Sequence, residues 1–469
     1  MKKSNKEKPF WIKNSKPNSS PEFKIDPALL SEWLEQSNFF QIKTFGNPQI
    51  VKVTNNIVSI KTPMEVYADV LDFVKLEDDR ILQSCFIQQG EQLLISKKAI
   101  LGSLPMFNIP RYRDSKEIVR LFYKNIVIII SKNNLTSETY KKFEKLNEFI
   151  FEKQIINREI NLSVKNKSEF KKFLKCVTYD KLHFENIMCS IGYLISSYKN
   201  PSQTKAVIFT DVLSQIKNEA YGRSGKGIII KAISEIIPVV EYNGKITDLT
   251  NDKFAFQNVN LTTQLIVLQD VDKSFKFESL FSILTDNMSI ERKHCPKIDI
   301  PFSESPKIAI TTNYTIPQNS YSYKDRKLLV LLNNFFNSSN KPEEHLKGLL
   351  FNSWSSKEFK KFDNFIISCV QLFLKDGLSV YEVKQLSKEK LIKSTSIEFL
   401  NLMDIEILPK NIPFKAKDIC AKIDVPGLNA MSKGKMLSRW IYLYAEYKGF
   451  LIEKKLINGV TAFYLKPNE

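Results

Sequence analysis

The sequence has little of what a disulfide-bonded protein or a zinc protein needs. Its 469 residues include six cysteines and three histidines, and no two cysteines form a C-x-x-C pair. Because zinc sites need Cys or His ligands at close spacing, this scarcity argues against a structural zinc site. Scattered single cysteines are typical of a reducing cytosol, where they pack as small apolar side chains. The composition therefore predicts a cytoplasmic protein without disulfides.

Long apolar runs are also missing. Ile126–Ile130 is one of the longest, whereas a helix that spans a membrane needs roughly 20 apolar residues. The first residues, Met1–Lys6, lead into no apolar signal core. We therefore expect a soluble protein with no membrane partner.

Positive charge is what the sequence has in excess. Lys and Arg number 69 against 51 Asp and Glu, which gives a formal net charge of +18. An excess of this size suits a polyanionic partner, usually nucleic acid. The alternative is a lysine-rich proteome in which Lys fills solvated faces. The apolar content of 43% predicts a folded chain, and the length predicts two to four domains.

Composition divides the chain into six segments. A basic arm (1–24) is followed by an α+β domain of unknown role (25–165) and a helical lead-in (166–202). An α/β core (203–335), a helical segment (336–409) and a C-terminal module (410–469) complete the chain. The arm is polar and rich in Lys, so we expect it to be flexible. The core alternates apolar strands with helices, which is typical of an α/β sheet with crossovers. Its strand candidates are Ala206–Phe209, Leu265–Leu268 and Lys307–Thr311, and Asn337–Pro342 is a polar connector behind it.

A glycine-rich stretch in the core, Ala220–Gly227, is the strongest motif. Glycines let backbone N–H groups curl around phosphate oxygens, and the helix that follows adds its positive N-terminal end. Lys226 supplies a charge for the β and γ phosphates. The strand before the stretch and the apolar helix after it, Ile228–Ile236, favour a triphosphate site over an ordinary glycine turn. The predicted ATP ligands are Gly222, Arg223, Ser224, Gly225, Lys226, Gly227 and Ile228.

Two more polar signals follow apolar strands downstream. Leu265–Leu268 leads into Gln269 and Asp270, and a carboxylate at the end of a buried strand is what a metal-bound triphosphate needs. Lys307–Thr311 leads to Asn313, whose amide is suited to orienting an attacking water. Each residue alone is also an ordinary turn former. Their order behind the loop predicts that Asp270 and Asn313 are catalytic, with Asp272 as the reserve candidate for the acid.

Basic residues lie between and after these motifs. The segment Ser289–Lys297 contains Arg292, Lys293 and His294, and it is predicted to be a hairpin or loop that contacts nucleic acid. The alternative is a solvated charge run. Arg326 is a candidate arginine finger for a neighbour's γ-phosphate, with a surface salt bridge as the alternative.

This order of motifs resembles that of the superfamily 3 helicases, a group related to the AAA+ ATPases. The similarity is greatest to the helicase part of phage, plasmid and poxvirus-type primase-helicases, and it covers residues 170–375. The resemblance implies an ATP- and Mg²⁺-dependent homo-hexameric ring that moves 3′ to 5′ on single-stranded DNA in its pore. It also implies roles for Lys226 in the phosphate loop, Asp270 as the Walker B acid, Lys293 in the pore hairpin, Asn313 as the sensor and Arg326 as the finger.

Two positions depart from the family pattern. Gly227 stands where a hydroxyl residue normally holds magnesium, and Gln269 stands where such proteins often have the first of two acids. Either Mg²⁺ is held by water, the Gln269 carbonyl and Asp270, or hydrolysis is weakened. The N-terminal part also lacks a D-x-D with a downstream His, so the sequence does not support a primase activity.

The last sixty residues are predicted to form a winged helix. The pattern is a helix over Ala416–Ile423, a longer helix over Lys433–Tyr447, and a hairpin of Leu451–Leu456 with Val460–Leu465. The candidate DNA contacts on the longer helix are Lys433, Lys435 and Arg439. Winged helices also bind proteins, so both uses stay open. We expect Trp440, Tyr442 and Tyr444 to pack in the core.

Together these features predict an α/β protein with an AAA+-like P-loop core, an N-terminal α+β region and a C-terminal winged helix. The predicted function is an ATP-dependent DNA helicase encoded by a phage or mobile element and active in the bacterial cytoplasm, with single-stranded DNA, duplex origin DNA and other replication proteins as partners. The alternative is a replication initiator or assembly factor that binds nucleotide and DNA but turns ATP over poorly.

Overall fold

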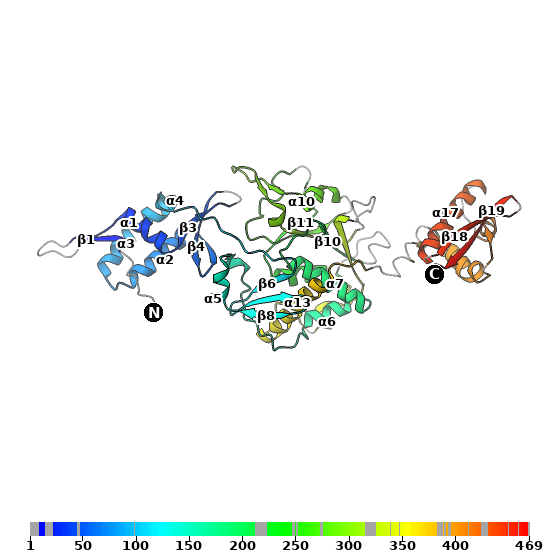
Figure 1. Cartoon of the computed structure of the whole chain (residues 1–469), viewed down its shortest axis with the longest axis horizontal. Coiled ribbons are helices and arrows are strands. Elements are labelled where there is room, and N and C mark those ends of the chain that lie inside the picture. Colours follow the sequence, from blue (N-terminus) through cyan, green and yellow to red (C-terminus); the bar gives the residue numbers. More distant parts are fainter. Residues whose placement is uncertain are drawn as a thin grey trace. The chain divides into compact units, whose positions relative to one another are not determined.

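The computed structural model describes residues 9–467 except 15–21, 45–46, 98, 212–222, 246–248, 250–251, 273–274, 315–324, 338, 347, 382–387, 389–390, 393–394, 411, 424–429, 449 and 458. The chain forms two compact units, which are described separately below (Figure 1). The first comprises Met1–Thr210 and Gly222–Ser379, and the second comprises Asp211–Tyr221 and Val380–Glu469. Within the described residues, no helix is both long and apolar enough to span a membrane. All six cysteines are unpaired.

The N-terminal part of the first unit has a core of its own, and that core includes residues of the predicted flexible arm. Strand β1 (Trp11–Asn14) pairs with β2 (Glu22–Ile25), and Phe10 is fully buried. The Phe10 ring lies 5.3 Å from that of Trp33. The prediction of a flexible arm is therefore wrong for residues 9–14 and 22–24. The Lys-rich composition of this stretch concealed two adjacent aromatic residues, Phe10 and Trp11. The free energy gained by burying them outweighs the conformational entropy that the segment loses.

Helices and a small sheet build the rest of this part. Helix α1 (Pro27–Gln36) follows an Asp26 cap, and α2 (Pro63–Lys75) begins with a Thr62–Glu65 capping box. The remaining helices are α3 (Arg80–Glu91), α4 (Ala99–Ser103) and α5 (Tyr140–Phe143). The sheet has the order β3-β4-β5-β9 and consists of Phe39–Ile42, Gln49–Thr54, Ile57–Lys61 and Ile150–Phe151.

A three-stranded antiparallel sheet joins the larger core that follows. Its strands β6, β7 and β8 are Ile118–Phe122, Val127–Ser131 and Leu135–Glu138. Val119 and Ile128 share one buried cluster with helices that come more than 50 residues later in the chain. Residues 118–131 therefore pack with the predicted α/β core, although the sequence placed them in a separate domain.

The central sheet has five strands in the order β11-β12-β15-β10-β16. These are Val239–Asn243, Leu265–Val271, Lys307–Thr312, Ala206–Asp211 and Lys327–Leu332. The β11/β12, β12/β15 and β10/β15 pairs are all parallel. The three predicted strands are confirmed. Strands β11 and β16 were not predicted, and β11 has only two consecutive apolar residues, Val239 and Val240. Parallel pairing places the polar residues that follow β12 and β15 at the same edge of the sheet as the end of β10.

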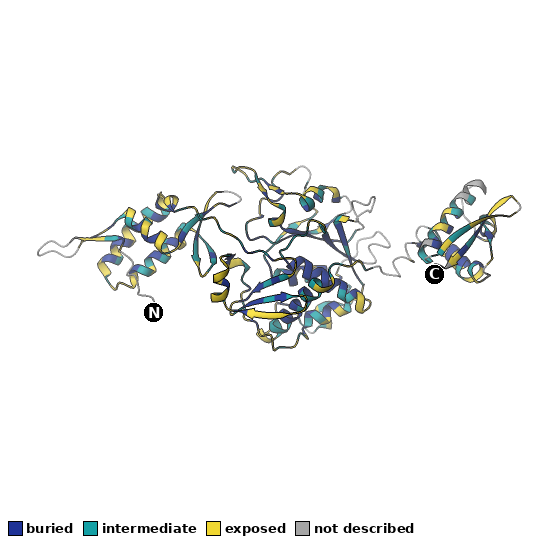
Figure 2. Cartoon of the chain, in the orientation of Figure 1, coloured by how far each residue is buried: buried dark blue, intermediate teal, exposed yellow. Residues whose placement is uncertain are grey.

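Both faces of this sheet are covered, because alternate residues of each strand enter different cores (Figure 2). Leu265 and Val267 pack with α6 (Glu169–Cys176), α7 (Lys181–Ile195), α9 (Lys226–Ser234) and α13 (Ser356–Asp376). Ile266 and Leu268 pack on the opposite face with α10 and a hairpin of β13 and β14, which are Phe281–Thr285, Met288–Ile290 and Ile298–Ile300. The sheet is thus a rigid support for whatever lies at its edge.

Lys307, the first residue of β15, is buried and joins the sheet to the end of α7. Its ammonium donates to the carbonyls of Tyr193 at 2.6 Å and Ser196 at 2.7 Å. The pKa of Lys307 is lowered from its usual 10.5 to about 7, mainly by burial; the Asp114 carboxylate opposes this shift, and the nearby cations Lys199 and Arg113 add to it. Folding therefore favours the neutral amine of this residue.

We expect the free energy of unfolding to depend on pH through Lys307. Between pH 10.5 and 7 the unfolded chain takes up a proton that the folded chain does not. Stability is thus lost as pH falls through this window, by at most about 1.4 kcal/mol per pH unit. Denaturant unfolding of the wild type and Lys307→Met at pH 7.5 to 9.5 measures this slope, which should be shallower in the variant; Lys199, whose pKa is lowered to about 8, contributes a slope to both proteins. Parallel pH curves for the two proteins would contradict this assignment.

The second unit contains the predicted helices and hairpin. Helices α16 (Ala416–Cys420) and α17 (Ala430–Lys448) precede β18 (Phe450–Ile457) and β19 (Val460–Pro467), which pair antiparallel. A short strand β17 (Phe414–Lys415) adds to β19. The core of this unit also includes α15 (Ile397–Leu402). The module is thus larger than predicted, because the contact boundary falls at residue 380 and not at 410.

Candidate nucleotide site and basic surfaces

The glycine-rich stretch ends in a helix N-terminus that is shaped by Gly225. This residue is the N-cap of α9 and has φ 95°, in the left-handed region that favours glycine, and no side chain caps the helix. A Cβ at Gly225 would also lie 2.4 Å from the Phe173 ring of α6. The first turn of a nine-residue helix is therefore presented without a side-chain cap, as an anion site requires. The predicted ligand Gly222 lies outside the described residues.

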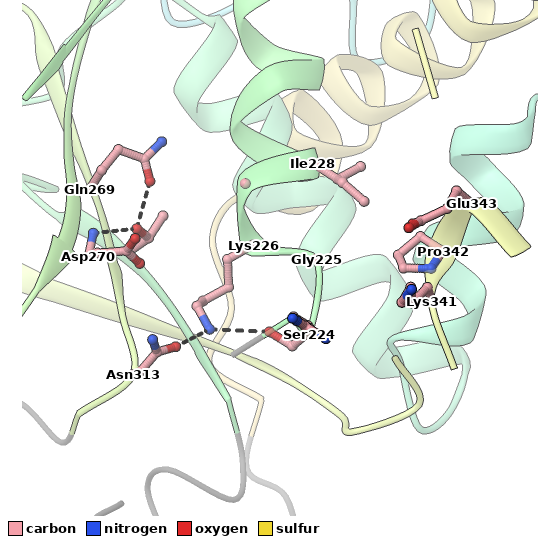
Figure 3. A pocket seen from close by; sticks show the side chains of 13 residues that line it. Ser224, Gly225, Lys226, Ile228, Gln269, Asp270, Asn313, Lys341, Pro342 and Glu343 are labelled. Carbon is pink, nitrogen blue, oxygen red and sulfur yellow. Dashed lines mark hydrogen bonds between the residues drawn. The ribbon is translucent and has the colours of Figure 1, made fainter. Parts of the chain in front are cut away.

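Lys226, the first residue of α9, joins the loop to the next strand. Its side chain is only 6% exposed, and its ammonium donates to Ser224 Oγ at 3.2 Å and to Asn313 Oδ1 at 2.6 Å (Figure 3). Asn313 follows β15, which is the neighbour of β10 in the sheet. The fold thus brings together the predicted lysine and the predicted strand-end amide across 87 residues of sequence.

Asp270 lies on a bulge of β12, where the register with β15 shifts between Leu268 and Val271. Its φ of 52° is unusual for a residue with a side chain, and its own N–H stabilises this conformation by donating to Thr311 Oγ1 at 2.8 Å. The bulge leaves the Asp270 side chain exposed at the carboxyl edge of the sheet. Backbone strain supported by a specific hydrogen bond is typical of functional sites.

Gln269 is held by hydrogen bonds at both ends of its amide. Its Nε2 donates to Glu241 Oε2 at 2.8 Å, and its Oε1 accepts from Thr311 Oγ1 at 2.7 Å. A chain of hydrogen bonds therefore runs from Glu241 on β11 through Gln269 and Thr311 to the Asp270 backbone. The predicted metal ligand Gln269 is fixed by its neighbours, so its main observable role is to hold Asp270 and Thr311 in place.

These residues surround a cavity of about 710 Å³ at the carboxyl edge of the sheet (Figure 3). The lining includes the predicted residues Arg223, Ser224, Gly225, Lys226, Gly227, Ile228, Gln269, Asp270 and Asn313. It also includes four residues that sequence reasoning missed: Thr311, Lys341, Pro342 and Glu343. Thr311 was recognisable, since it precedes Asn313 by two positions and side chains two apart on a strand share a face. Nothing in the connector around Lys341 distinguished it.

The cavity has more groups that bind phosphate oxygens than groups that bind magnesium. Lys226 and the α9 N-terminus offer positive charge and N–H groups to phosphate oxygens. For a cation, Asp270 is the one lining carboxylate on the central sheet, and Glu343 lies on the separate α12 (Pro342–His345). No described group of three or more His, Cys, Asp or Glu residues could hold a metal. Mg²⁺ would thus depend on Asp270, the nucleotide's own oxygens and water.

Gly227 is free to accept a side chain. It is the second residue of α9, and a Cβ built on it meets no atom within 4 Å. The requirement for a conformation that only glycine accepts applies to Gly225 and not to Gly227.

We expect Gly227→Ser to place a hydroxyl beside the phosphates without disturbing the loop. This substitution should lower the Mg²⁺ concentration for half-maximal turnover several-fold and raise turnover. Gly227→Ala is the matched control, because it gives a similar gain in helix propensity, on the order of 0.5–1 kcal/mol, without an oxygen. A magnesium titration of the three proteins separates the effects. If Ser and Ala behave alike, position 227 takes no part in metal binding.

The basic segment between the second and third motifs forms the predicted hairpin. Strands β13 and β14 pair antiparallel from Met288↔Ile300 to Ile290↔Ile298. Lys293 and His294 are exposed in the connecting loop, and His294 has a φ of 60°. Arg292 was predicted to contact nucleic acid. Instead, it is partly buried, and its guanidinium donates to the Val259 carbonyl within the same chain. Arg292 anchors the loop base, so Lys293 and His294 are the residues that the loop presents to solvent.

Arg326 lies outside the nucleotide cavity of its own chain. It precedes β16, and its guanidinium stacks over the Phe281 ring of α10 at 4.8 Å. Phe281 belongs to the layer on the face of the sheet away from α9. A contact between Arg326 and a nucleotide would therefore have to involve a neighbouring copy.

In the second unit, Arg439 is exposed on α17, and Lys433 and Lys435 occupy earlier turns of the same helix. Tyr444 is fully buried and Trp440 packs against the same core, as expected. Tyr442 was expected in the core but is 42% exposed, with Lys454 above its ring at 5.3 Å. The helix spacing places Tyr442 on the side opposite to Tyr444.

No protein-family model matches the chain, and no curated protein matches it. Among solved structures, two apo structures of the NrS-1 C-terminal region align with TM-scores of 0.40 and 0.41 at 13% and 12% identity. They cover 94% and 95% of this chain and 100% of theirs. JCV helicase aligns over 51% of this chain and 64% of its own, with a TM-score of 0.25 and 15% identity. Similarity this low assigns neither a family nor an activity.

Proposed function

We propose that this chain is an ATPase of the superfamily 3 helicase type that moves along single-stranded DNA in the 3′ to 5′ direction. The observation that carries the proposal is the position of Lys226. Its ammonium lies between Ser224 of the loop and Asn313 of β15, in the cavity that also contains Asp270. Phosphoryl transfer requires a glycine-rich loop, a cation, an acid and an amide close together. Here all four lie at one edge of a parallel sheet.

Each residue has a distinct task in this proposal. Lys226 and the first turn of α9 bind the β and γ phosphates, and Gly225 allows the close approach. Asn313 accepts from Lys226 through Oδ1, which leaves its amide nitrogen to orient water or contact the γ-phosphate. The Asp270 carboxylate accepts a hydrogen bond from a water that coordinates the cation, and so orients that water. Mg²⁺, when bound, supplies charge neutralisation at the phosphates.

Contacts with DNA would come from two surfaces. Lys293 and His294 at the hairpin tip are exposed donors suited to phosphate oxygens. The order of α16, α17, β18 and β19 is that of a winged helix, with Arg439 exposed on the longer helix. The hairpin would contact single-stranded DNA in the pore, and the second unit would contact duplex DNA. A phage or mobile element that replicates in a bacterial cytoplasm is the setting that fits these roles.

The test is the ATPase rate of the purified chain with and without single-stranded DNA. The proposal expects a basal rate that DNA stimulates and that Lys226→Ala removes. A strand-displacement assay with 3′ and 5′ overhangs then tests the direction. Absence of ATPase activity under both conditions, with ATP still bound, would refute the helicase function.

The second candidate function is a replication initiator or assembly factor that binds ATP and DNA but hydrolyses slowly. One observation favours it, because Gln269 replaces an acid and both ends of its amide are already bonded. With Gly227 also lacking a hydroxyl, the site has few cation ligands. Tight ATP binding with a rate near the uncatalysed one would support this function over the first.

A finger role for Arg326 makes a prediction about mixed assemblies. If Arg326 completes the site of a neighbour, Arg326→Ala mixed with wild type should reduce ATPase activity more steeply than its mole fraction. Mixing Lys226→Ala with Arg326→Ala should even restore some activity, because one interface in the mixture has both residues. A loss strictly proportional to the mutant fraction would indicate that each chain's site is complete.

A further inference from the structure

A second cavity, distinct from the nucleotide site, lies where α6, α7 and α13 meet the β7–β8 turn. Its volume of about 730 Å³ matches the 710 Å³ of the nucleotide cavity. Five lysines line it: Lys132, Lys171, Lys175, Lys181 and Lys375. We call this cavity the lysine pocket.

The positive charge of the lysine pocket is poorly compensated. Its one carboxylate, Glu185, pairs with Lys181 at 3.7 Å. Within the described part of the chain, Lys132, Lys175 and Lys375 have no carboxylate within 4 Å. Burial lowers the pKa of Lys171, and the nearby Lys175 lowers it further. An anionic partner would relieve this repulsion.

The floor of the lysine pocket is apolar. Phe184, Met188 and Leu372 contribute to it and are continuous with the main core. Proteins that bind single strands use several rings on which successive bases stack, whereas this floor has one half-buried ring, Phe184, together with Met188 and Leu372. Lysines around an apolar floor with few rings suit a peptide that combines carboxylates with an aliphatic side chain.

The same chain carries such a peptide at the turn between α2 and α3. Leu76 at this turn is 81% exposed, the most exposed large apolar side chain among the described residues. Glu77 and Asp78 follow it, both exposed and, among described residues, without an ion-pair partner. The Leu76 N–H donates to the carbonyls of Phe73 and Val74, and Asp78 has φ 52°, so the chain turns sharply here and presents these side chains to solvent. We call Leu76–Asp79 the acidic turn.

We propose that the acidic turn of one copy docks into the lysine pocket of a second copy. Leu76 covers the apolar floor, and Glu77 and Asp78 pair with pocket lysines such as Lys175 and Lys375. Because the two surfaces differ, the contact is head-to-tail, and successive copies form a ring if the rotation closes. The ring rests on the proposed function, but the contact itself requires neither nucleotide nor DNA.

Charge-reversed variants, alone and mixed with each other, test this contact. Their self-association is measured by sedimentation velocity of the full chain at low salt, without nucleotide. Lys175→Glu/Lys375→Glu and Glu77→Lys/Asp78→Lys should each weaken self-association by about 10- to 100-fold. An equimolar mixture of the two variants should associate again, since each pocket then meets a turn of opposite charge. Lys116→Glu/Lys124→Glu, which changes two exposed lysines elsewhere on this unit, controls for net charge and should associate like the wild type.

Three results would overturn the proposal. If both charge-reversed variants associate like the wild type, the proposed contact does not exist. If their mixture fails to associate, the two surfaces do not pair with each other. If Lys175→Glu/Lys375→Glu instead weakens single-stranded DNA binding and leaves association unchanged, the lysine pocket binds nucleic acid. Wild-type ATP affinity in each variant shows that the fold is intact and keeps this test separate from that of the nucleotide site.

Discussion

Lys226→Ala should weaken ATP binding by about 100-fold or more, because charged hydrogen bonds to phosphate contribute roughly 1.5–3 kcal/mol each. The ammonium is nearly buried, and Ser224 and Asn313, to which it donates, also line the cavity, so its charge lies at the centre of the proposed phosphate site. Equilibrium binding of a fluorescent ATP analogue measures the loss.

Lys226→Met is the matched control for this prediction. It keeps the apolar stem of the side chain and removes only the charge, so both variants should lose affinity equally. Thermal unfolding of both should stay close to that of the wild type. Unchanged nucleotide affinity in a folded Lys226→Ala protein would show that the cavity is not a triphosphate site.

Asp270→Asn should reduce ATP turnover by about 100-fold, with ATP affinity changed only a few-fold. Asn tolerates the left-handed conformation that Asp270 adopts, so the bulge of β12 should survive while the negative charge is lost. Single-turnover ATP hydrolysis measures the effect on the chemical step.

Asp270→Ala separates the charge from the backbone. Ala lacks the carboxylate and also disfavours φ 52°, so this variant should in addition unfold more easily, by roughly 1 kcal/mol. Equal turnover in Asp270→Asn and the wild type would exclude Asp270 as the catalytic acid and leave Glu343 as the lining carboxylate to test next.

The sequence predicted the parts of the site that depend on local patterns. Apolar runs that end in Asp270 and Asn313 identified β12 and β15, because a buried parallel strand is a continuous apolar segment. Gly225 and Lys226 were recognisable because few residue types can form an uncapped phosphate loop.

The remaining parts depend on pairings between distant residues, which a single sequence does not encode locally. Glu241 lies on a strand with no strongly apolar run, and its contact with Gln269 exists only because β11 and β12 are neighbours. Lys341 reaches the cavity from beyond the sheet. Phe10 shows the same limit at the N-terminus, where tertiary packing outweighs a polar composition.

The bond between Glu241 and Gln269 also restricts how this site can evolve. The pair consists of one carboxylate and one amide, and exchanging the two residue types preserves the number of donors and acceptors between β11 and β12. A single change of Gln269 to Glu would set two carboxylates against each other at a separation of 2.8 Å, whereas a single change of Glu241 to Gln leaves two amides that can still bond. The second path is therefore the accessible one. An acid at position 269 would therefore be tolerated best after Glu241 on the edge strand β11 had been replaced by an amide.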